Sequence, residues 1–340
     1  MAFINKNHFW PGIILFLLII PLITNSNYLL SILIIIGLYT IIVQGLGILM
    51  GYAGQISFGH AAFFGLGAYT VAILTTRFHC PTVLALLGAV LLPGVIAALI
   101  GRPTLKLQEL YLALATLGFG LLVHIGFTEG MELTGGPSGI AGIPYLSVGS
   151  FVFDSDIKFF YLIAGILILL SAGIKGLIES RVGRALRAIR ESEHAAETAG
   201  IDTAALKLQA FIFSALLAGL AGGLYAYYIT FISPSPFSFH ASVQFVLMAV
   251  VGGLGTFVGP LLGAALVVAL GEFLRWAIPV VIPNAGGEYQ IIFFGLILVV
   301  LMIFQPEGLG ALGKRFKLST QKLPGEGYST KFEAEKEGGL

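Results

Sequence analysis

Glycines and polar side chains follow directly after a long apolar run near residue 50. The segment from Gly51 to Thr70 reads GYAGQISFGHAAFFGLGAYT and holds five glycines. An amide, a hydroxyl and an imidazole at this place could hydrogen-bond a polar solute, because a polar group that faces lipid is costly and is normally turned inward. The candidate residues for lining a translocation path are Gly51, Gly54, Gln55, Ser57, Gly59 and His60.

Two interpretations of this segment are open. Each glycine weakens a helix by about 1 kcal/mol relative to alanine, so a membrane helix carries many only where backbones approach closely or where the helix breaks. A broken helix exposes backbone N–H and C=O groups that can line a water-accessible cavity. The alternative is a tightly packed helix pair in which Gln55 and His60 bond to neighbours. The sequence favours a broken helix for the segment and leaves each side chain open.

A second glycine cluster interrupts the apolar run of residues 242–278, which is too long for one span. It reads VVGGLGTFVGPLLGAAL, from Val250 to Leu266. Two corresponding breaks favour two related halves, a repeat that stays a hypothesis because glycine-rich runs resemble one another. This cluster adds three candidate path residues, which are Gly252, Gly253 and Gly255.

Other polar residues in apolar runs do not form the spacing of a catalytic or metal site. Glu272 and Arg275 lie three residues apart on one helix face, where they predict an ion pair or a position at the outer interface. For these two residues, and for His124 and Gln244, structural contacts are favoured over roles in a path. The single cysteine, Cys80, cannot form a disulfide within the chain. The sequence therefore predicts neither an enzyme nor a metal site.

The composition predicts which kind of secondary structure positions these residues. Of the 340 residues, 57% are hydrophobic and 10% charged, whereas soluble proteins are about 25% charged. Backbone polar groups within a bilayer are satisfied by helices, so we expect an all-α polytopic bundle of about 8–10 spans with short or broken helices. The first span, at about 10–24, is predicted to be uncleaved. The net charge of +1 gives no reason to expect nucleic acid as a partner.

Charged residues between the spans predict the orientation. Segment 129–157 contains four carboxylates and no Lys or Arg. Because Lys and Arg are retained in the cytoplasm, we expect this segment outside and the arginine-rich segment 179–207 inside. Alternation of the spans then places both termini in the cytoplasm, with Arg77 as an exception on the outer side.

The predicted cytoplasmic loop, at about 179–206, has the most regular polar pattern in the chain. Gly200 is expected to end a helix there, and Asp202 or Thr203 to cap the next. An amphipathic helix in this loop could dock a soluble partner, or its arginines could contact anionic membrane lipid. The arginines recur every three residues, at Arg181, Arg184, Arg187 and Arg190.

Several motifs, in order along about residues 28–310, resemble those of one transporter family. They are GYAGQISFGHAAFFGLGAY, YLALATLGFG, LTGGPSGI, RVGRALRAIRESEHAAETAGID and GGLGTFVGPLLGAAL. Together they are similar to the LivM-type permease subunit of branched-chain amino acid ABC transporters.

The resemblance implies a bacterial inner-membrane importer. In such an importer a LivM-type and a LivH-type permease subunit sit over two cytoplasmic ATP-binding subunits and receive substrate from a periplasmic substrate-binding protein. This chain would then form half of the path and need no cofactor, because its partners hydrolyse ATP. We expect a transmembrane permease domain over 1–310 and a disordered cytoplasmic tail over 311–340.

The resemblance also assigns the loop. The segment from Glu193 to Gly200 is similar to the permease loop that contacts the ATPase, in which an Ala-Ala pair precedes a glycine by a fixed spacing. Ala195, Ala196 and Gly200 fit that pattern, whereas His194 stands where the widespread version has Glu. The remaining candidate polar contacts are Arg184, Arg187, Arg190, Glu191 and Glu193.

The sequence leaves two other transport functions open and argues against a nucleotide site. A permease of the same family that carries urea or short-chain amides, or other neutral amino acids, is compatible with the same motifs. An ion-coupled secondary transporter would need an intramembrane carboxylate, for which Glu272 is the best candidate. GLGALGK, from Gly308 to Lys314, matches part of a phosphate-binding loop, but Arg315 replaces the Ser/Thr and the segment follows a span rather than a strand.

Overall fold

The computed structural model describes residues 26–104, 109–281, 287–305 and 308–311. The expected first span at 10–24 and almost all of the expected C-terminal tail lie outside these residues. In chain order the elements are α2 (Asn27–Gly51), α3 (His60–Thr76), α4 (Thr82–Thr104), α5 (Glu109–Glu129), α6 (Met131–Thr134), η1 (Gly136–Ser138), β1 (Ile140–Ala141), β2 (Ser147–Val148), β3 (Phe151–Val152), α7 (Asp156–Glu179), α8 (Arg181–Glu191), α9 (Glu193–Thr198), α10 (Thr203–Ile229), β4 (Phe231–Ile232), η2 (Ser235–Phe237), α11 (Phe239–Gly252), α12 (Gly259–Val281), α13 (Gly287–Phe304) and η3 (Leu309–Ala311).

The described chain is a polytopic bundle of helices, as its composition predicts. Six described helices are long and apolar enough to cross a membrane, and α3 and α11 are shorter apolar helices. The apolar run at 242–278 is divided into α11 and α12 at its glycine cluster, which confirms the predicted break. The polar segment before α3 likewise separates two helices.

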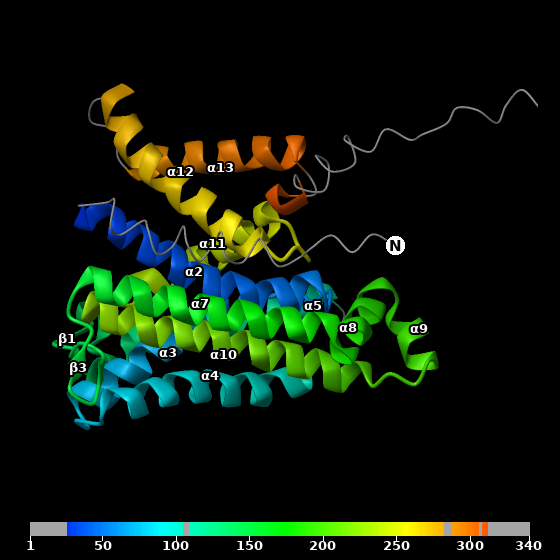
Figure 1. The fold of residues 1–340 in the computed structure, drawn as a ribbon, viewed down its shortest axis with the longest axis horizontal. Helices are drawn as coiled ribbons and strands as arrows, with labels where there is room; N and C mark the ends of the chain where they lie inside the picture. Colours follow the sequence, from blue (N-terminus) through cyan, green and yellow to red (C-terminus); the bar gives the residue numbers. More distant parts are fainter. Residues whose placement is uncertain (1–25, 105–108, 282–286, 306–307, 312–340) are drawn as a thin grey trace, which may run out of the picture.

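Helices α2 and α10 form the centre of the bundle (Figure 1). Helix α10 packs against α2, α3 and α4, and α2 also contacts α7, α11 and α12. Glycines make the α3–α10 contact possible, because a Cβ atom at Gly67 would collide with the carbonyl of Gly219, and one at Gly222 with the carbonyl of Phe64. Close packing of small residues is a common source of helix association where water is absent.

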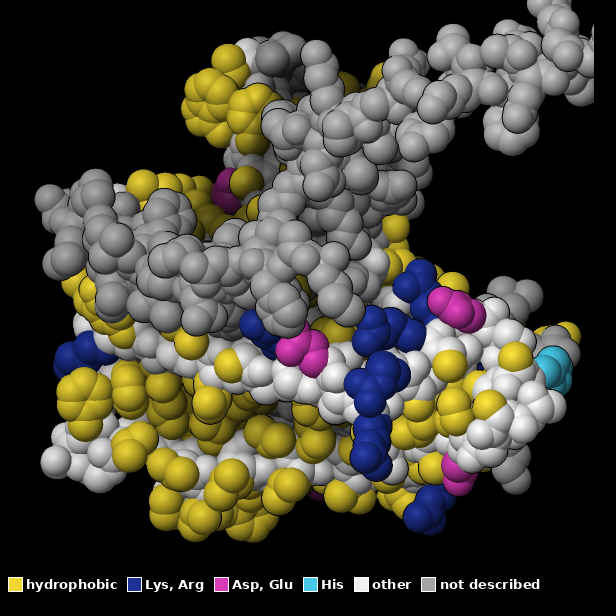
Figure 2. Space-filling model, turned by 45° about the vertical axis from the view of Figure 1, so that its right-hand side comes forward, with side chains coloured by type: hydrophobic (Ala, Val, Ile, Leu, Met, Phe, Trp, Pro, Cys, Tyr) yellow, Lys and Arg dark blue, Asp and Glu magenta, His cyan; other side chains and the backbone are white. Residues whose placement is uncertain are grey.

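The two ends of the bundle differ in character (Figure 1). At one end, here called the strand end, β1 pairs antiparallel with β4 and β2 with β3. At the other, the α8 end, α8 and α9 project from the bundle. Figure 2 shows a band of Lys and Arg side chains toward this end, beside hydrophobic side chains that cover the bundle.

The tight α3–α10 contact leads to a stability prediction. We expect Gly222→Val to lower the thermal stability of the detergent-purified protein, because the new side chain forces α10 away from Phe64. Overpacking a core costs about 1–3 kcal/mol, and a clash with backbone is harder to relieve. Gly165→Val in α7 is the control, since an added Cβ there meets open space. Equal melting temperatures for the two variants would contradict this account of the packing.

Candidate functional site

At the first helix break the chain folds back against the end of α2. Helix α2 ends at Gly51 and α3 begins at His60. Gly54 adopts a φ of 70°, a left-handed conformation that favours glycine. The backbone N–H of Gln55 then donates to the carbonyl of Leu49 at 3.0 Å. Helix α3 therefore starts inside the bundle instead of at its end.

Hydroxyl groups from three other helices hold the start of α3. The first N–H groups of a helix have no partner within it and need one elsewhere. Here the N–H of Phe58 donates to Thr116 Oγ1 at 3.1 Å, and that of Ala61 to Ser242 Oγ at 3.0 Å. His60 Nε2 pairs with Ser214 Oγ at 2.6 Å. The break is thus fixed by α5, α10 and α11 together.

The second break separates α11 from α12. Gly253 and Gly255 have φ angles of 104° and 76°, so each adopts a conformation that other residues rarely take. The N–H of Gly253 donates to the carbonyl of Val250 at 3.0 Å, and Thr256 Oγ1 donates to the carbonyl of Gly253 at 2.8 Å. A Cβ atom at Gly252 would collide with the carbonyl of Gly259. The glycines that predict the break also permit its folding.

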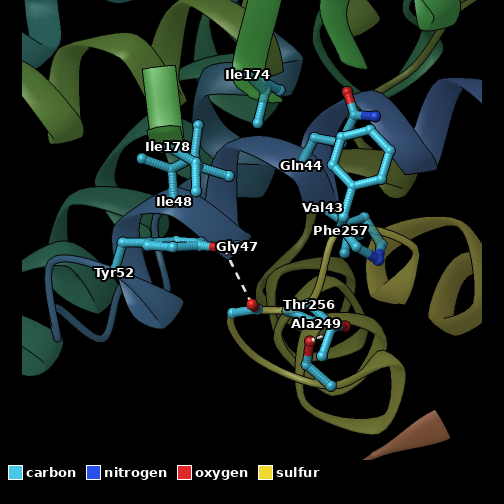
Figure 3. A pocket seen from close by; sticks show the side chains of 13 residues that line it. Val43, Gln44, Gly47, Ile48, Tyr52, Ile174, Ile178, Ala249, Thr256 and Phe257 are labelled. Carbon is cyan, nitrogen blue, oxygen red and sulfur yellow. Dashed lines mark hydrogen bonds between the residues drawn. The ribbon is translucent and has the colours of Figure 1, made fainter. Parts of the chain in front are cut away.

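The two breaks meet in space, although about 200 residues separate them. A Cβ atom at Gly51 would lie 2.6 Å from the nitrogen of Gly255, so only glycine allows this approach. Tyr52 Oη donates to the carbonyl of Gly255 at 3.0 Å, a bond drawn in Figure 3. The region formed by Gly51, Tyr52, Gly54, Gly255 and Arg190 is called the helix-break junction below.

Arg190 of α8 joins the predicted cytoplasmic loop to this junction. Its Nη1 donates to the carbonyl of Gly51, the last residue of α2. A cation at this position also interacts favourably with the negative end of the helix dipole. The aliphatic stem of Arg190 packs beside Gly54, where an added Cβ would lie 3.4 Å from its Cγ. One side chain of the loop therefore contacts the first break directly and faces the second.

Two other arginines of α8 bond within the α7–α8 corner. Arg184 Nη1 donates to the carbonyl of Glu179 at 3.1 Å, and Arg187 Nη2 to that of Ile178 at 3.0 Å. The apolar side of α8 is buried, with Leu186 3% exposed. The predicted amphipathic helix is confirmed, and its arginines have unequal roles.

Helix α9 lies at the outer limit of the α8 end. Ala196 is 2% exposed, whereas Ala195, Glu191 and Glu193 have exposed surface available to a partner. Glu193 forms an ion pair with Lys207 at 2.5 Å. Gly200, with a φ of 81°, follows the end of α9.

The predicted cap of the following helix is formed by Asp202. Its side chain accepts a hydrogen bond from the N–H of Ala205 at 3.0 Å and so caps α10. The predicted helix stop and the predicted cap are both confirmed.

The candidate path residues are divided between two places. Gly253 and Gly255 line a small pocket beside the junction, together with Gln44, Tyr52 and Thr256 (Figure 3). By contrast Gln55, Ser57 and His60 are 3%, 1% and 1% exposed, within the protein interior. Gln55 Oε1 has no hydrogen-bond partner. Their assignment to a path stays a prediction.

Sequence reasoning missed most partners of the break. Thr116, Ser214 and Ser242 are hydroxyl residues among apolar neighbours, and such residues also bond to their own helix backbone. Tyr52 was likewise passed over. Isolated hydroxyls in spans are a weak signal that becomes informative only when a glycine-rich break must be satisfied nearby.

The other polar residues of the apolar runs occupy defined positions. Glu272 and Arg275 form an ion pair at 3.1 Å, and Tyr28 Oη donates to Glu272 at 2.7 Å. Across the described ranges, the fully buried polar side chains are uncharged, and no group of His, Cys, Asp and Glu is arranged to hold a metal. His124 is partly buried, and its Nδ1 has no hydrogen-bond partner.

The described part of GLGALGK packs on the second break rather than forming a nucleotide site. Gly308 lies against Gly253, where an added Cβ would come within 2.5 Å of its nitrogen, and Gly310 lies against Thr256. The residues that follow Ala311 lie outside the described chain. The first half of this motif thus has a packing role.

Comparison with known proteins identifies relatives over most of the chain. The family described as branched-chain amino acid transport system, permease component, matches residues 28–302. The chain is 32% identical over 313 residues to the high-affinity branched-chain amino acid transport system permease protein LivM of Salmonella typhimurium, covering 85% of this chain and 72% of that protein. No solved structure matches the chain significantly.

Two further relatives show lower identity. A probable branched-chain amino acid transport permease protein LivM of Methanocaldococcus jannaschii is 26% identical, covering 80% of this chain and 90% of that protein. The permease protein LivH of Salmonella typhimurium is 25% identical, with the same two coverages. The similarity thus extends to both LivM and LivH proteins.

The His60–Ser214 contact leads to a second stability prediction. Ser214→Ala leaves the buried imidazole of His60 without its Nε2 partner, which costs about 1–3 kcal/mol. We expect a lower melting temperature, with partial recovery in the double variant His60→Leu/Ser214→Ala. Thr198→Ala is the control, because this exposed hydroxyl donates to the carbonyl of Ala195 within its own helix turn. A melting temperature unchanged by Ser214→Ala would show that the contact does not stabilise the fold.

Proposed function

Because the chain belongs to the family of permease components of the branched-chain amino acid transport system, we propose that it forms half of the translocation path of an ATP-driven importer. Its cargo would be a branched-chain or other neutral amino acid, and the relatives named for this transport support that choice. The chain itself would catalyse no reaction. Its partners would be a LivH-type permease subunit, two cytoplasmic ATP-binding subunits and a periplasmic substrate-binding protein.

The proposed orientation places the α8 end in the cytoplasm of a bacterial cell. The four arginines of α8 lie at this end, and Lys and Arg are retained on the cytoplasmic side. The strand end, which carries Asp154 and Glu132, would then face the periplasm. Both chain termini would be cytoplasmic.

The proposed transport mechanism depends on the contact between Arg190 and the end of α2. ATP-binding subunits that dock on α9 and α8 would move the loop, and Arg190 would transmit this movement to Gly51. Tyr52 extends the connection to Gly255 and hence to α11 and α12. Because two broken helices meet there, a small displacement of α8 would shift both, and the path would alternate between outward-open and inward-open states.

Arg190→Gln tests this connection most directly. We expect vesicles containing the whole transporter to retain ATP hydrolysis. They should take up at least several-fold less leucine per ATP hydrolysed, because movement of the loop is no longer transmitted to α2. Arg181→Gln is the matched control, since Arg181 is exposed at the first position of the same helix. Equal leucine-to-ATP ratios in the two variants would contradict the coupling role of Arg190.

The surface of α9 gives a further prediction about assembly. Ala195 is exposed, so Ala195→Glu leaves the fold intact but places a bulky charge where the ATP-binding subunit would dock. We expect at least a several-fold loss of co-purifying ATP-binding subunit. His194→Glu should retain it, because His194 is 99% exposed and the resembling loops carry Glu at this position. The idea fails if both variants capture the subunit equally well.

Uptake of radiolabelled solutes into the same vesicles tests the proposed cargo and the proposed class of transporter. ATP-dependent entry of leucine that requires the binding protein supports the proposal. Uptake of urea instead would keep the class and change the cargo. Ion-driven uptake by the chain alone would overturn the proposal in favour of a secondary transporter.

A further inference from the structure

A polar pocket of about 510 Å³ lies between α2, α10, α11, α12 and α13, away from the helix-break junction. Its charged residue Glu272 accepts a hydrogen bond from Tyr28, near the first turn of α2, whereas the junction is at the last turn. The pocket is therefore in the half of the bundle nearer the strand end. Its lining includes Tyr39, Tyr225, His240, Gln244, Glu272 and Arg275.

The charges on this pocket disfavour a position against lipid chains. Arg275 is 70% exposed and Glu272 26% exposed, which is too costly in contact with lipid chains. The outer face of α4 shows the opposite character, with Leu91 60% and Leu99 66% exposed. We expect this distribution, with exposed charges on one side of the bundle and exposed leucines on another, when the charged side faces water or a second subunit.

The pocket combines two kinds of wall. Arg275 and Glu272 present a cation and an anion 3.1 Å apart, and Gln244 adds an amide. The other wall is apolar and includes Val268 and Phe294. Ammonium and carboxylate groups on one carbon atom match such a charge pair, and an aliphatic side chain matches the apolar wall. The volume is within the range of about 300–1,000 Å³ found for small-molecule sites.

We propose that this pocket is where the permease receives a zwitterionic aliphatic amino acid, with Arg275 on its carboxylate and Glu272 on its ammonium group. The inference rests on the proposed transport function and deepens it by naming the residues that meet the cargo. It also separates two tasks, since the buried glycine-rich breaks transmit movement while the solvent-open charge pair holds the substrate. The ion pair between Glu272 and Arg275 is the resting state that the zwitterion replaces.

Cysteine labelling locates the pocket. The chain has one cysteine, so Cys80→Ala gives a cysteine-free background. Gln244→Cys is placed in the pocket and Leu169→Cys, where the leucine is 74% exposed on α7, serves as the control. The complete transporter is reconstituted in vesicles of phosphatidylglycerol, whose headgroup carries no ammonium group to compete with leucine. A membrane-impermeant charged thiol reagent is then applied.

We expect the reagent to label Gln244→Cys and not Leu169→Cys. Leucine should slow the labelling of Gln244→Cys several-fold, whereas 4-methylpentanoate, which lacks the ammonium group, should not. Equal protection by both compounds, or no protection by leucine, would overturn the proposal. So would labelling of the lipid-facing control at the same rate.

Charge variants test the assigned partners. Arg275→Gln and Glu272→Gln, each combined with Gln244→Cys, should raise the leucine concentration that gives half-protection at least tenfold. A purely structural ion pair would leave that concentration unchanged and would be restored by the swap Glu272→Arg/Arg275→Glu. If the ATP-binding subunit co-purifies but leucine does not protect, this inference alone fails. If that subunit does not co-purify with the unaltered chain, the proposed transport function fails.

Discussion

The hydrogen bond from Arg190 to the final carbonyl of α2 joins α8 directly to the region where the two helix breaks meet. This bond requires α8 to lie against the end of α2. The sharp corner between α7 and α8 places it there. The bond also needs the chain after Gly51 to turn away, since a continuing helix would use that carbonyl itself. The break at Gly51 therefore leaves its carbonyl available to Arg190.

Backbone contact, rather than side-chain chemistry, dominates the centre of this protein. Gly51 against Gly255 and Gly67 against Gly219 are contacts that any side chain would block. In a membrane the hydrophobic effect does not hold helices together, so close approach and hydrogen bonds at helix ends must do so. This is why the glycines are concentrated at the two breaks and along α3 and α10, and why serine and threonine hydroxyls meet the start of α3.

The sequence predicted the elements better than their contacts. Apolar run lengths and glycine clusters located the spans and both breaks, and the arginine spacing located α8. Nothing in the local pattern shows that residue 51 touches residue 255, because that contact depends on how α2 and α12 pack. For the same reason the sequence alone could not show that His60 pairs with Ser214. The charges of Glu272 and Arg275 were visible, but their shared pocket with α11 and α13 was not.

The claim that α8 and the helix-break junction move as one unit is tested most directly by spin-label distances in the reconstituted transporter. In the Cys80→Ala background, one label pair joins Arg181 on α8 to Leu261 on α12, and a second joins Arg181 to Phe78 at the strand end, all three being exposed. The account predicts that ATP binding leaves the first distance unchanged and shifts the second. A first distance that changes while the second stays constant would contradict it.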